Sequence, residues 1–358
     1  MKIVIDARFT RTDHHDGISR YGASLIAATS KIADVSMLIS DPRQLALLPD
    51  VPYTLITSPL SPLELFVARK VNATGADVVV CPMQTMGTWG RKYGLILTLH
   101  DLIYYEHPAP PGFLPAPVRL LWRLYHKAFW PQRLLLNRAD IVATISRTTE
   151  ALMAKYKLTR RPVRIIANAP QPAQEPRNPD AGAEKTIIYM GSFMPYKNVE
   201  TMVAGMAGLT GYTLHLLSRI TPQRRTELER TIPPGASVVF HNGVTDAEYD
   251  ALLRRATALV SLSRAEGYGL PLVEAMAVGT PVIASDIPIF REVGGDAAIY
   301  VDPESPAQFA DAVAQLRDGA HWQELSRRSI ARAREFSWDE SARQLVDAAH
   351  EVMAKKRR

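Results

Sequence analysis

Cysteine is nearly absent from this chain, and other features are missing as well. Cys81 is the only cysteine among 358 residues, which excludes an internal disulfide and a zinc site built from several cysteines. No apolar run approaches the ~18 residues of a membrane-spanning helix, and Asp6 and Arg8 interrupt the start, where a secretory signal would be apolar. No segment has low complexity. These absences favour a folded protein of a reducing cytoplasm.

Two motifs of nucleotide and metal chemistry are also missing. No G-x-G-x-x-G follows the first predicted strand, where MKIVIDARFTRTDHHDG stands, and this argues against a nicotinamide-dependent dehydrogenase. No Asp-x-Asp triplet is present, so we expect neither a bound metal ion nor a cofactor. Asp13, His14, His15 and Asp16 are potential metal ligands, which we interpret as a solvated loop.

The charge is unevenly distributed. The chain has a net charge of +6, yet residues 1–170 hold 21 lysines and arginines against 12 acidic residues, so the excess is N-terminal. A positive field favours an anionic partner, which could be nucleic acid, anionic lipid or a phosphorylated substrate.

Two α/β domains are predicted from the length and from the alternation of strand and helix patterns. Strand patterns occur at 1–9, 35–40, 53–57, 77–82, 94–101 and 140–146, and again at 185–193, 212–218, 236–243, 258–263, 280–285 and 298–302. Between the two sets, 170–185 contains prolines at 170, 172, 176 and 179 and is typical of a linker. We therefore predict domains at 1–169 and 186–336, and a C-terminal helix at 337–358 that packs back on the first domain.

Alternating strands and helices predict an open parallel sheet in each domain, with a doubly wound, Rossmann-like order. We expect the two domains to face a central cleft. Ligands of such sheets bind outside the carboxyl ends of the strands. The residues that directly follow strands are therefore the candidates for chemistry.

The most informative segment is 258–288, ALVSLSRAEGYGLPLVEAMAVGTPVIASDIP. A buried strand is followed by Gly267-Tyr268-Gly269, a turn that glycine makes readily, and then by a helix with Pro271 in its first turn and Gly279 at its end. We expect the backbone N–H groups from Tyr268 to Leu270 to point out of the helix N-terminus. They would form an anion site suited to a diphosphate.

Three charged side chains lie in or beside two turns of the second half. One turn is Gly267-Tyr268-Gly269, and the other is GSFMPYK, which follows the strand KTIIYM. Glu266 and Glu274 lie on either side of the first turn, and carboxylates of this kind accept hydrogen bonds from sugar hydroxyls. The alternative is that Glu266 caps the helix and that Glu274 is solvated. Lys197, after Gly191, can bind a phosphate as a point charge, or it can be an ordinary surface lysine at a helix start.

Together, GSFMPYK and EGYGLPLVE resemble the donor site of family-four glycosyltransferases of the GT-B fold, whose signature is two glutamates separated by seven residues. GISRY, HDLIYYEHP, HNGVTDAEYDALLRRA and REVGGDAAIYVDP extend the resemblance over most of the chain. The resemblance implies that Glu266 contacts the donor sugar, Glu274 the nucleotide ribose and Lys197 the diphosphate.

Two positions depart from the pattern of this family. Ser192 stands where many members carry an arginine that clamps the phosphate, so Lys197 and backbone N–H groups would neutralise the donor. LLSRI, at Ser218 and Arg219, replaces a glycine-rich turn near the nucleobase. The backbone at Gly243 and Val244 is then the expected contact of the base.

In the first half, the resemblance assigns roles to residues after two other predicted strands. His100 follows the strand GLILTL and is the candidate catalytic residue beside the reacting sugar, with Asp101 next to it on the acceptor side. The alternative is a packed histidine bonded to Asp101. Gly17 would let the backbone approach the diphosphate or the acceptor, and Arg20 would bind the same anion or lie on a solvated face.

The implied reaction is transfer of a hexosyl group from a nucleoside diphosphate sugar to a hydroxyl, with retention at the anomeric carbon. HDLIYYEHP and GISRY resemble mannosyltransferases of bacterial polysaccharide assembly, which favours GDP-mannose as donor over UDP-glucose. A nucleotide-sugar epimerase and a catalytically silent scaffold are alternatives. Nucleic-acid binding would leave EGYGLPLVE unexplained, and we do not expect it.

The acceptor is suggested by 116–133, which we predict as one amphipathic helix. Its apolar residues include Val118, Leu121, Trp122, Tyr125 and Phe129, and its basic residues include Arg119, Arg123 and Lys127. Such a helix fits the surface of an anionic membrane, where a lipid-linked saccharide would be met. The alternative is a helix that packs inside the domain and has a basic outer face.

Overall fold

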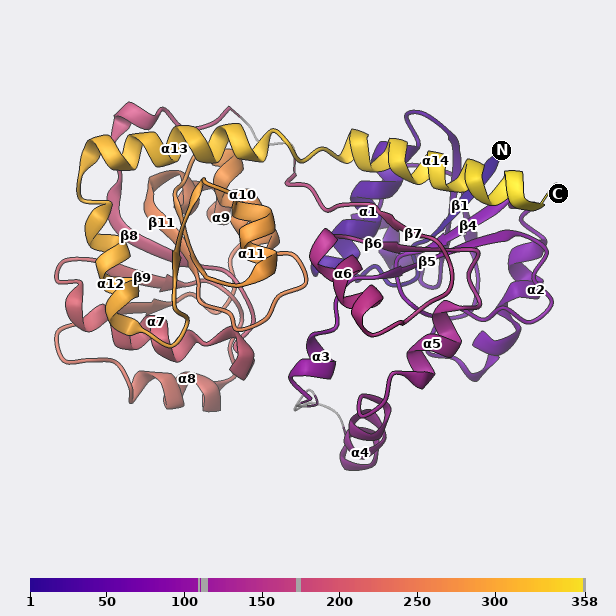
Figure 1. The fold of residues 1–358 in the computed structure, drawn as a ribbon, viewed down its shortest axis with the longest axis horizontal. Coiled ribbons are helices and arrows are strands. Elements are labelled where there is room, and N and C mark those ends of the chain that lie inside the picture. Colours follow the sequence, from indigo (N-terminus) through magenta and orange to yellow (C-terminus); the bar gives the residue numbers. More distant parts are fainter. Residues whose placement is uncertain (109, 111–114, 172–174, 357–358) are drawn as a thin grey trace. The chain divides into compact units, whose positions relative to one another are not determined.

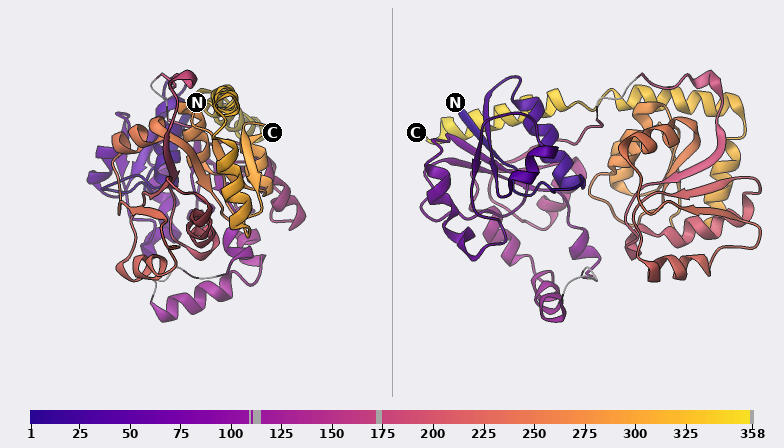
Figure 2. Two further views of the ribbon diagram at one scale, coloured as in Figure 1. Left: turned by 90° about the vertical axis from the view of Figure 1, so that its left-hand side faces the viewer. Right: turned by 180° about the vertical axis from the view of Figure 1, so that it is seen from behind.

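The computed structural model describes residues 1–108, 110, 115–171 and 175–356, and it divides the chain into two compact units. Unit 1 comprises Met1–Asn168 and Ser337–Arg358, and unit 2 comprises Ala169–Phe336. Each unit is built around its own parallel sheet with helices on its faces (Figure 1; Figure 2).

The sheet of unit 1 has seven parallel strands in the order β3-β2-β1-β4-β5-β6-β7. The strands are β1 (Lys2–Asp6), β2 (Asp34–Ile39), β3 (Tyr53–Leu55), β4 (Val78–Cys81), β5 (Gly94–Leu99), β6 (Ile141–Thr144) and β7 (Val163–Ile165). The helices are α1 (Gly17–Thr29), α2 (Val67–Asn72), α3 (Ile103–Glu106), α4 (Ala116–Tyr125), α5 (Trp130–Leu136), α6 (Arg147–Lys155) and α14 (Trp338–Lys356), with 3-10 helices η1 (Pro42–Leu47) and η2 (Pro62–Phe66).

The sheet of unit 2 has six parallel strands in the order β10-β9-β8-β11-β12-β13. The strands are β8 (Glu184–Tyr189), β9 (Thr213–Leu216), β10 (Ser237–Phe240), β11 (Ala256–Ser261), β12 (Val282–Ser285) and β13 (Ala298–Val301). The helices are α7 (Val199–Gly205), α8 (Pro222–Glu229), α9 (Asp246–Arg255), α10 (Leu270–Val278), α11 (Pro288–Gly294), α12 (Pro306–Gln315) and α13 (Gly319–Ala333), with η3 (Pro179–Ala181), η4 (Pro195–Lys197) and η5 (Met206–Gly208).

The central strands form because their residues are apolar almost without interruption. β5 and β11 are buried along their whole lengths, as expected for strands covered by helices on both faces. The order of strands reverses between β1 and β4 in unit 1 and between β8 and β11 in unit 2. These reversals mark where a doubly wound sheet binds its ligands.

The last helix, α14, belongs to unit 1 although it follows unit 2 in sequence. It packs on α1 and on the strands β5, β4 and β7. Leu345 in α14 is fully buried, and Ser341 Oγ donates a hydrogen bond of 2.8 Å to the carbonyl of Ala167. The chain therefore leaves unit 1 after Asn168 and returns to it at Ser337.

A buried ion-pair network follows β1. Arg8 binds both carboxylate oxygens of Asp6 at 2.8 Å, and it binds Glu64 of η2 at 2.7 and 3.1 Å. Burial by itself disfavours a charged guanidinium, but the two carboxylates outweigh it and raise the pKa of Arg8. The network fixes η2 against the carboxyl end of β1.

All twelve predicted strand patterns contain a strand, and two predictions about local structure differ from the structure. β7 is an additional short strand, which the sequence did not signal because it has only three residues, none of them buried. The predicted linker 170–185 is only partly described, since 172–174 lie outside the described residues; Arg177 donates its backbone N–H to Val278, and β8 begins at Glu184. Residues 175–185 are thus part of unit 2.

The predicted helix at 116–133 is also wrong in part. It consists of two helices, α4 and α5, separated by residues 126–129. Trp122 and Tyr125 contact His126, and Phe129 stacks on Tyr105 and Tyr156. Pro131 in the first turn of α5 requires a helix start there, because proline has no N–H to continue the preceding helix.

Candidate functional site

The parallel pairing of β8 with β11 brings the two predicted turns of unit 2 together. Ile188 is the register partner of Leu259, so both strands end at the same edge of the sheet. The turn after β8 contains Gly191 and Lys197, and the turn after β11 contains Glu266. This edge is also where the order of strands reverses, which is the expected ligand position for a sheet of this kind.

Lys197 and Glu266 form an ion pair, although they are far apart in sequence. The side chains are only 14% and 15% exposed. Ser263 Oγ donates a second hydrogen bond, of 3.2 Å, to the same oxygen, Glu266 Oε1. Glu266 is therefore not a helix cap, and Lys197 is not an ordinary surface lysine.

Asn198 holds the two turns together, a role that the sequence analysis missed. Asn198 is buried, and its backbone adopts the left-handed conformation, with φ of 55°. Its Nδ2 donates to the carbonyls of Leu262 at 3.1 Å and Pro303 at 2.6 Å, and its Oδ1 accepts from Thr201 at 2.9 Å. Asparagine is one of the few residues other than glycine that adopts this backbone readily, and this was the available signal.

The first turn of α10 has the predicted geometry. Gly269 has φ of +94°, and a Cβ there would lie 2.8 Å from the ring of Phe290, so only glycine fits. Pro271 is in the first turn, and Gly279 ends the helix in the left-handed conformation. Gly267 and Tyr268 are buried, Leu270 is half-buried, and burial raises the pKa of the Tyr268 hydroxyl.

The remaining acid, Glu274, lies in the second turn of α10 and is half-buried. It is on the helix that begins beside Glu266. The two glutamates thus flank the same turn, as the spacing of seven residues predicts.

The turn after β8 is ordered by side chains beneath it. Tyr189 donates a hydrogen bond of 2.6 Å to the carbonyl of Ser192, and a Cβ on Gly191 would lie 2.7 Å from the Tyr189 hydroxyl. Tyr189 therefore requires a glycine at position 191, and the local sequence does not indicate this contact. Ser218 Oγ accepts the Gly191 N–H at 3.1 Å, and Ser192 is exposed.

The carboxyl ends of β9 and β10 form the neighbouring part of this edge. Gly243 has φ of +107° and donates its N–H to the carbonyl of Leu217 at 2.9 Å. The side chain of Arg219 is exposed and lies beside Gly243, where its Cγ would be 3.1 Å from an added Cβ. Val244, half-buried, follows in the same loop. Arg219 thus adds a cation to this edge, and the sequence pattern assigns no role to it.

In unit 1, His100 follows β5 and is held by neighbouring strands. Its Nε2 lies 2.7 Å from the carbonyl of Pro82, after β4, and Tyr21 of α1 packs edge-on against the ring with centroids 5.0 Å apart. Because a carbonyl only accepts, Nε2 carries the proton and neutral His100 leaves Nδ1 as an acceptor. Burial lowers the pKa of His100, so the ring is neutral at pH 7.

The other predicted residues of unit 1 follow β5 or lie in α1. Asp101 accepts the backbone N–H of Ile103 at 3.0 Å and so starts α3. Gly17 is the first residue of α1, where an added Cβ would meet nothing within 4 Å, and Arg20 is the fourth residue of the same helix. The fold itself does not require a glycine at 17.

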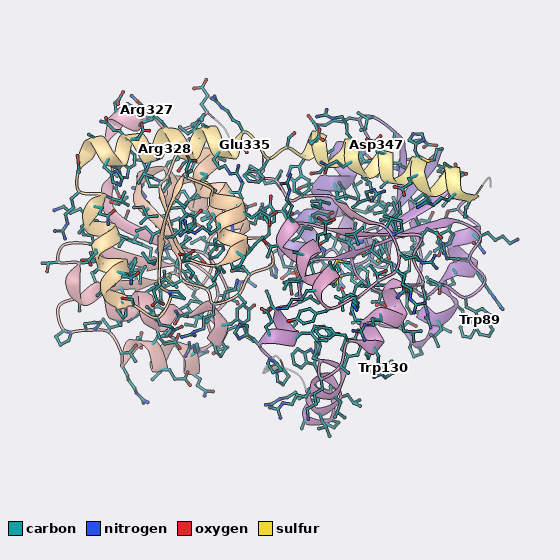
Figure 3. The ribbon with its side chains drawn as sticks, viewed as in Figure 1. Trp89, Trp130, Arg327, Arg328, Glu335 and Asp347 are labelled. Carbon is teal, nitrogen blue, oxygen red and sulfur yellow. The ribbon has the colours of Figure 1, made fainter. Side chains whose placement is uncertain are left out.

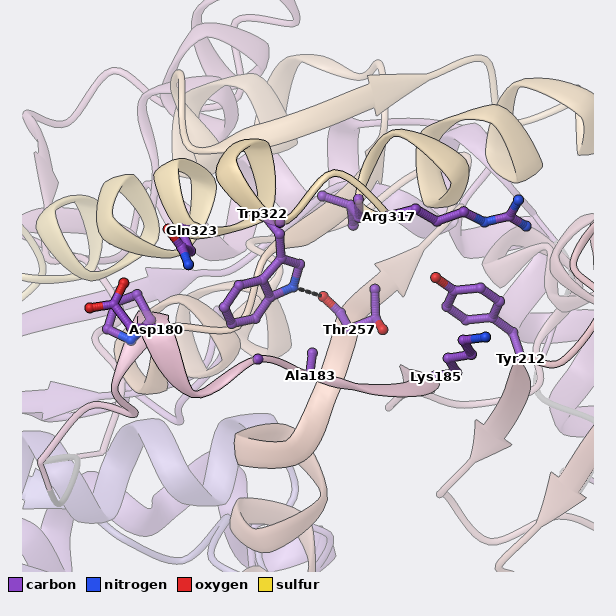
Figure 4. A pocket seen from close by; sticks show the side chains of 12 residues that line it. Asp180, Ala183, Lys185, Tyr212, Thr257, Arg317, Trp322 and Gln323 are labelled. Carbon is purple, nitrogen blue, oxygen red and sulfur yellow. Dashed lines mark hydrogen bonds between the residues drawn. The ribbon is translucent and has the colours of Figure 1, made fainter.

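A cavity of about 260 Å³ lies elsewhere in unit 2 (Figure 4). Trp322 and Thr257 line it, joined by a hydrogen bond of 2.8 Å, together with Lys185 and Tyr212. Lys185 and Thr257 stand at the amino ends of β8 and β11. The cavity is therefore at the opposite edge of the sheet from Lys197 and Glu266.

Among the described residues, no three His, Cys, Asp or Glu side chains are grouped as a metal site. In the predicted solvated loop, His14 Nδ1 lies 2.9 Å from Asp13. No helix in the described part of the chain is long and apolar enough to cross a bilayer.

The second half of the chain matches a known protein family. Residues 171–336 match the family described as glycosyl transferases group 1. Over 332 residues the chain is 25% identical to the O-antigen chain mannosyltransferase RfbU of Salmonella typhimurium, which covers 84% of this chain and 87% of that protein. Residues 171–336 are therefore a group 1 glycosyl transferase domain. As an enzyme the chain is a hexosyltransferase.

Solved structures show that this glycosyltransferase has the GT-B fold. Sucrose-phosphate synthase of Thermosynechococcus elongatus superposes with a TM-score of 0.73 at 22% identity, covering 99% of both chains. HepE of Anabaena, in complex with UDP and glucose, gives a TM-score of 0.71 at 17% identity, covering 97% of this chain and 99% of that one.

Replacing Asn198 should destabilise unit 2. In Asn198→Ala the carbonyls of Leu262 and Pro303 lose their donor and a β-carbon is forced into the left-handed region, so we expect a loss of about 2–4 kcal/mol in the free energy of unfolding. Asn198→Gly keeps the left-handed backbone conformation accessible, so it should lose less of the free energy of unfolding. Urea unfolding measures both; equal losses would contradict a contribution from the backbone conformation.

The lowered pKa of His100 should make unit 1 sensitive to acid. The unfolded histidine binds a proton as the pH falls through about 6.5, whereas the folded one binds it only at lower pH, so stability is lost in that window. His100→Asn should flatten the pH dependence of the urea midpoint between pH 7 and pH 5. The exposed His350→Asn is the control, and an unchanged slope in His100→Asn would contradict the prediction.

Proposed function

We propose that this glycosyltransferase moves a hexosyl group, with retention, from a nucleoside diphosphate sugar to a hydroxyl of a lipid-linked or growing saccharide. The observation that carries the proposal is the Lys197–Glu266 ion pair at the carboxyl ends of β8 and β11, close in sequence to the first turn of α10. A cation and helix N–H groups suit a diphosphate, and a carboxylate suits sugar hydroxyls. No cofactor or metal ion enters this reaction.

The donor exchanges partners within the ion pair. Without donor, Glu266 neutralises Lys197. An incoming diphosphate carries more charge than one carboxylate and takes over the ammonium group, since charge-assisted bonds to phosphate are strong. Glu266 keeps the hydrogen bond from Ser263 and becomes free to accept from a hydroxyl of the donor sugar. Binding of the diphosphate thereby prepares the recognition of the sugar.

In the chemical step, negative charge develops on the departing diphosphate, and the site stabilises that charge. The bond from the anomeric carbon to the diphosphate oxygen breaks while a bond to the acceptor oxygen forms on the same face of the sugar. The leaving phosphate oxygen takes the proton of the acceptor. Lys197, the backbone from Gly267 to Leu270 and the cation of Arg219 lower the energy of the departing diphosphate. Arg219 then supplies the charge that Ser192 lacks.

The nucleoside and the acceptor are assigned to the remaining positions. Glu274 accepts from the ribose hydroxyls, and the backbone at Gly243 and Val244 contacts the base. In unit 1, Nδ1 of neutral His100 accepts from the reacting sugar and orients it. The open space at Gly17 lets the backbone approach a phosphate or the acceptor, which Asp101 and Arg20 help to bind.

Glu266→Gln should impair transfer. It removes a charged acceptor worth ~1.5–3 kcal/mol, so kcat/KM should fall about 10- to 150-fold. Glu274→Gln should mainly raise KM for the donor. The exposed Glu227→Gln of α8 is the control. Release of nucleoside diphosphate with an acceptor saccharide measures turnover, and normal turnover in the double variant Glu266→Gln, Glu274→Gln would refute the proposal.

The donor is proposed to be GDP-mannose. RfbU, similar along most of its length, is named an O-antigen chain mannosyltransferase. HepE, which is similar in fold, binds UDP and glucose, and UDP-glucose is the second candidate. The HDLIYYEHP and GISRY fragments support GDP-mannose, because they resemble mannosyltransferases.

Nucleotide binding distinguishes the two donors directly. We expect GDP to raise the melting temperature of the protein and UDP to leave it unchanged, because a ligand that binds only the folded state stabilises it. Lys197→Met, which removes the cation, should abolish the shift. Stabilisation by UDP without GDP would replace GDP-mannose by a uridine donor and leave the transfer reaction standing.

A lipid-linked acceptor is supported by the exposed side chains of α4 and α5. α4 has no buried residue. Leu121 and Leu124 are exposed beside the basic Arg123, and Trp130 lies at the periphery of unit 1 (Figure 3). Exposed leucine and tryptophan beside arginine fit the interface of an anionic membrane. The protein is accordingly proposed to bind the membrane peripherally.

A further inference from the structure

A second apolar surface of unit 1 is exposed in a region to which the sequence analysis gave no role. It belongs to η2, the residue Leu60 before it, and the loop after β4. Leu60 is 92% exposed. Trp89, in the loop after β4, is 63% exposed and lies at the edge of unit 1 (Figure 3). We call this the Trp89 surface, and it consists of Leu60, Leu63, Leu65, Phe66 and Trp89.

The two segments of the Trp89 surface are held together by contacts between them. The rings of Phe66 and Trp89 have centroids 5.0 Å apart. The N–H of Gly87 donates to Glu64 Oε1 at 3.2 Å, and Glu64 is in turn bound by the buried Arg8. The apolar side chains therefore stand on a fixed support.

The charges around the Trp89 surface are positive. Arg69 lies over both aromatic rings, with its Cζ 5.8 Å from the centroid of Phe66 and 5.9 Å from that of Trp89. Lys70 and Lys92 are exposed. Within the described residues, none of Arg69, Lys70 and Lys92 forms an ion pair, so their charges are available to a partner.

The acids of the same region are already bonded. Glu64 and Asp77 are the only acidic residues between 58 and 92. Glu64 is bound by Arg8, and Asp77 Oδ2 accepts the backbone N–H of Lys2 at 2.7 Å. The field in front of the Trp89 surface is therefore that of the free cations.

We propose that the Trp89 surface docks on an anionic lipid bilayer, as a membrane contact separate from α4. Leucines and a tryptophan enter the interfacial region of a bilayer, and flanking lysines and arginines bind anionic headgroups. A symmetric contact with a second copy is disfavoured, because it would bring the same unpaired cations face to face. An anionic bilayer supplies the opposite charge over the whole surface.

Vesicle sedimentation tests the inference on the full chain. Wild type should sediment with vesicles of phosphatidylcholine and phosphatidylglycerol. The pair Leu63→Ser, Leu65→Ser should reduce the partition coefficient by at least about tenfold, because two exposed leucines no longer enter the bilayer. Lys70→Gln with Lys92→Gln should weaken binding to these vesicles and flatten its dependence on salt.

The controls separate this surface from folding and from α4. Ile32→Ser replaces an apolar residue of unit 1 that is 53% exposed but lies outside the surface, and it should bind as wild type does. Unchanged binding of Leu63→Ser, Leu65→Ser overturns the inference, even if Leu121→Ser, Leu124→Ser shows that α4 binds membrane. A dimer in lipid-free solution that the same leucine pair dissolves would also overturn it.

Discussion

The parallel pairing of β8 with β11 is the constraint on which the candidate site depends. It ends two strands at one edge of the sheet and so places the turn before α7 beside the turn before α10. Asn198 fixes this arrangement by bonding across it to Leu262 and Pro303. A shift of this register would separate Lys197 from Glu266 and leave each charge without its partner in a largely buried position.

The proposed exchange of partners on donor binding depends on the Lys197–Glu266 ion pair. Two charges that are 14% and 15% exposed are costly unless they are paired, and in the free protein they pair with each other. In the proposed reaction, a diphosphate replaces Glu266 as the partner of Lys197, and Glu266 is released to bind a sugar hydroxyl. Pairing of buried charges also shapes the Trp89 surface. Arg8 neutralises Glu64 there, so the exposed Lys70 and Lys92 keep their positive charge.

Much of the fold was predictable because strand and helix patterns are local. α10 begins and ends where the sequence predicts, since Gly269 and Gly279 bracket it. The break between α4 and α5 was missed, because an amphipathic pattern continues through it while the aromatic packing of Phe129 is a tertiary contact. The placement of Glu266 and Glu274 around one turn followed from spacing. The support of Gly191 by Tyr189 did not, because a glycine alone does not tell which neighbour excludes a β-carbon.

The sequence by itself determined the two α/β sheets, the glycine turn that opens α10 and the resemblance to glycosyltransferases, because each is encoded within a short segment. Only the tertiary structure decided that Lys197 bonds Glu266, that Asn198 joins the two turns and that η2 and Trp89 form one surface. These depend on contacts between residues distant in the chain. Such contacts are fixed by the pairing of strands and the packing of side chains, which no single segment contains.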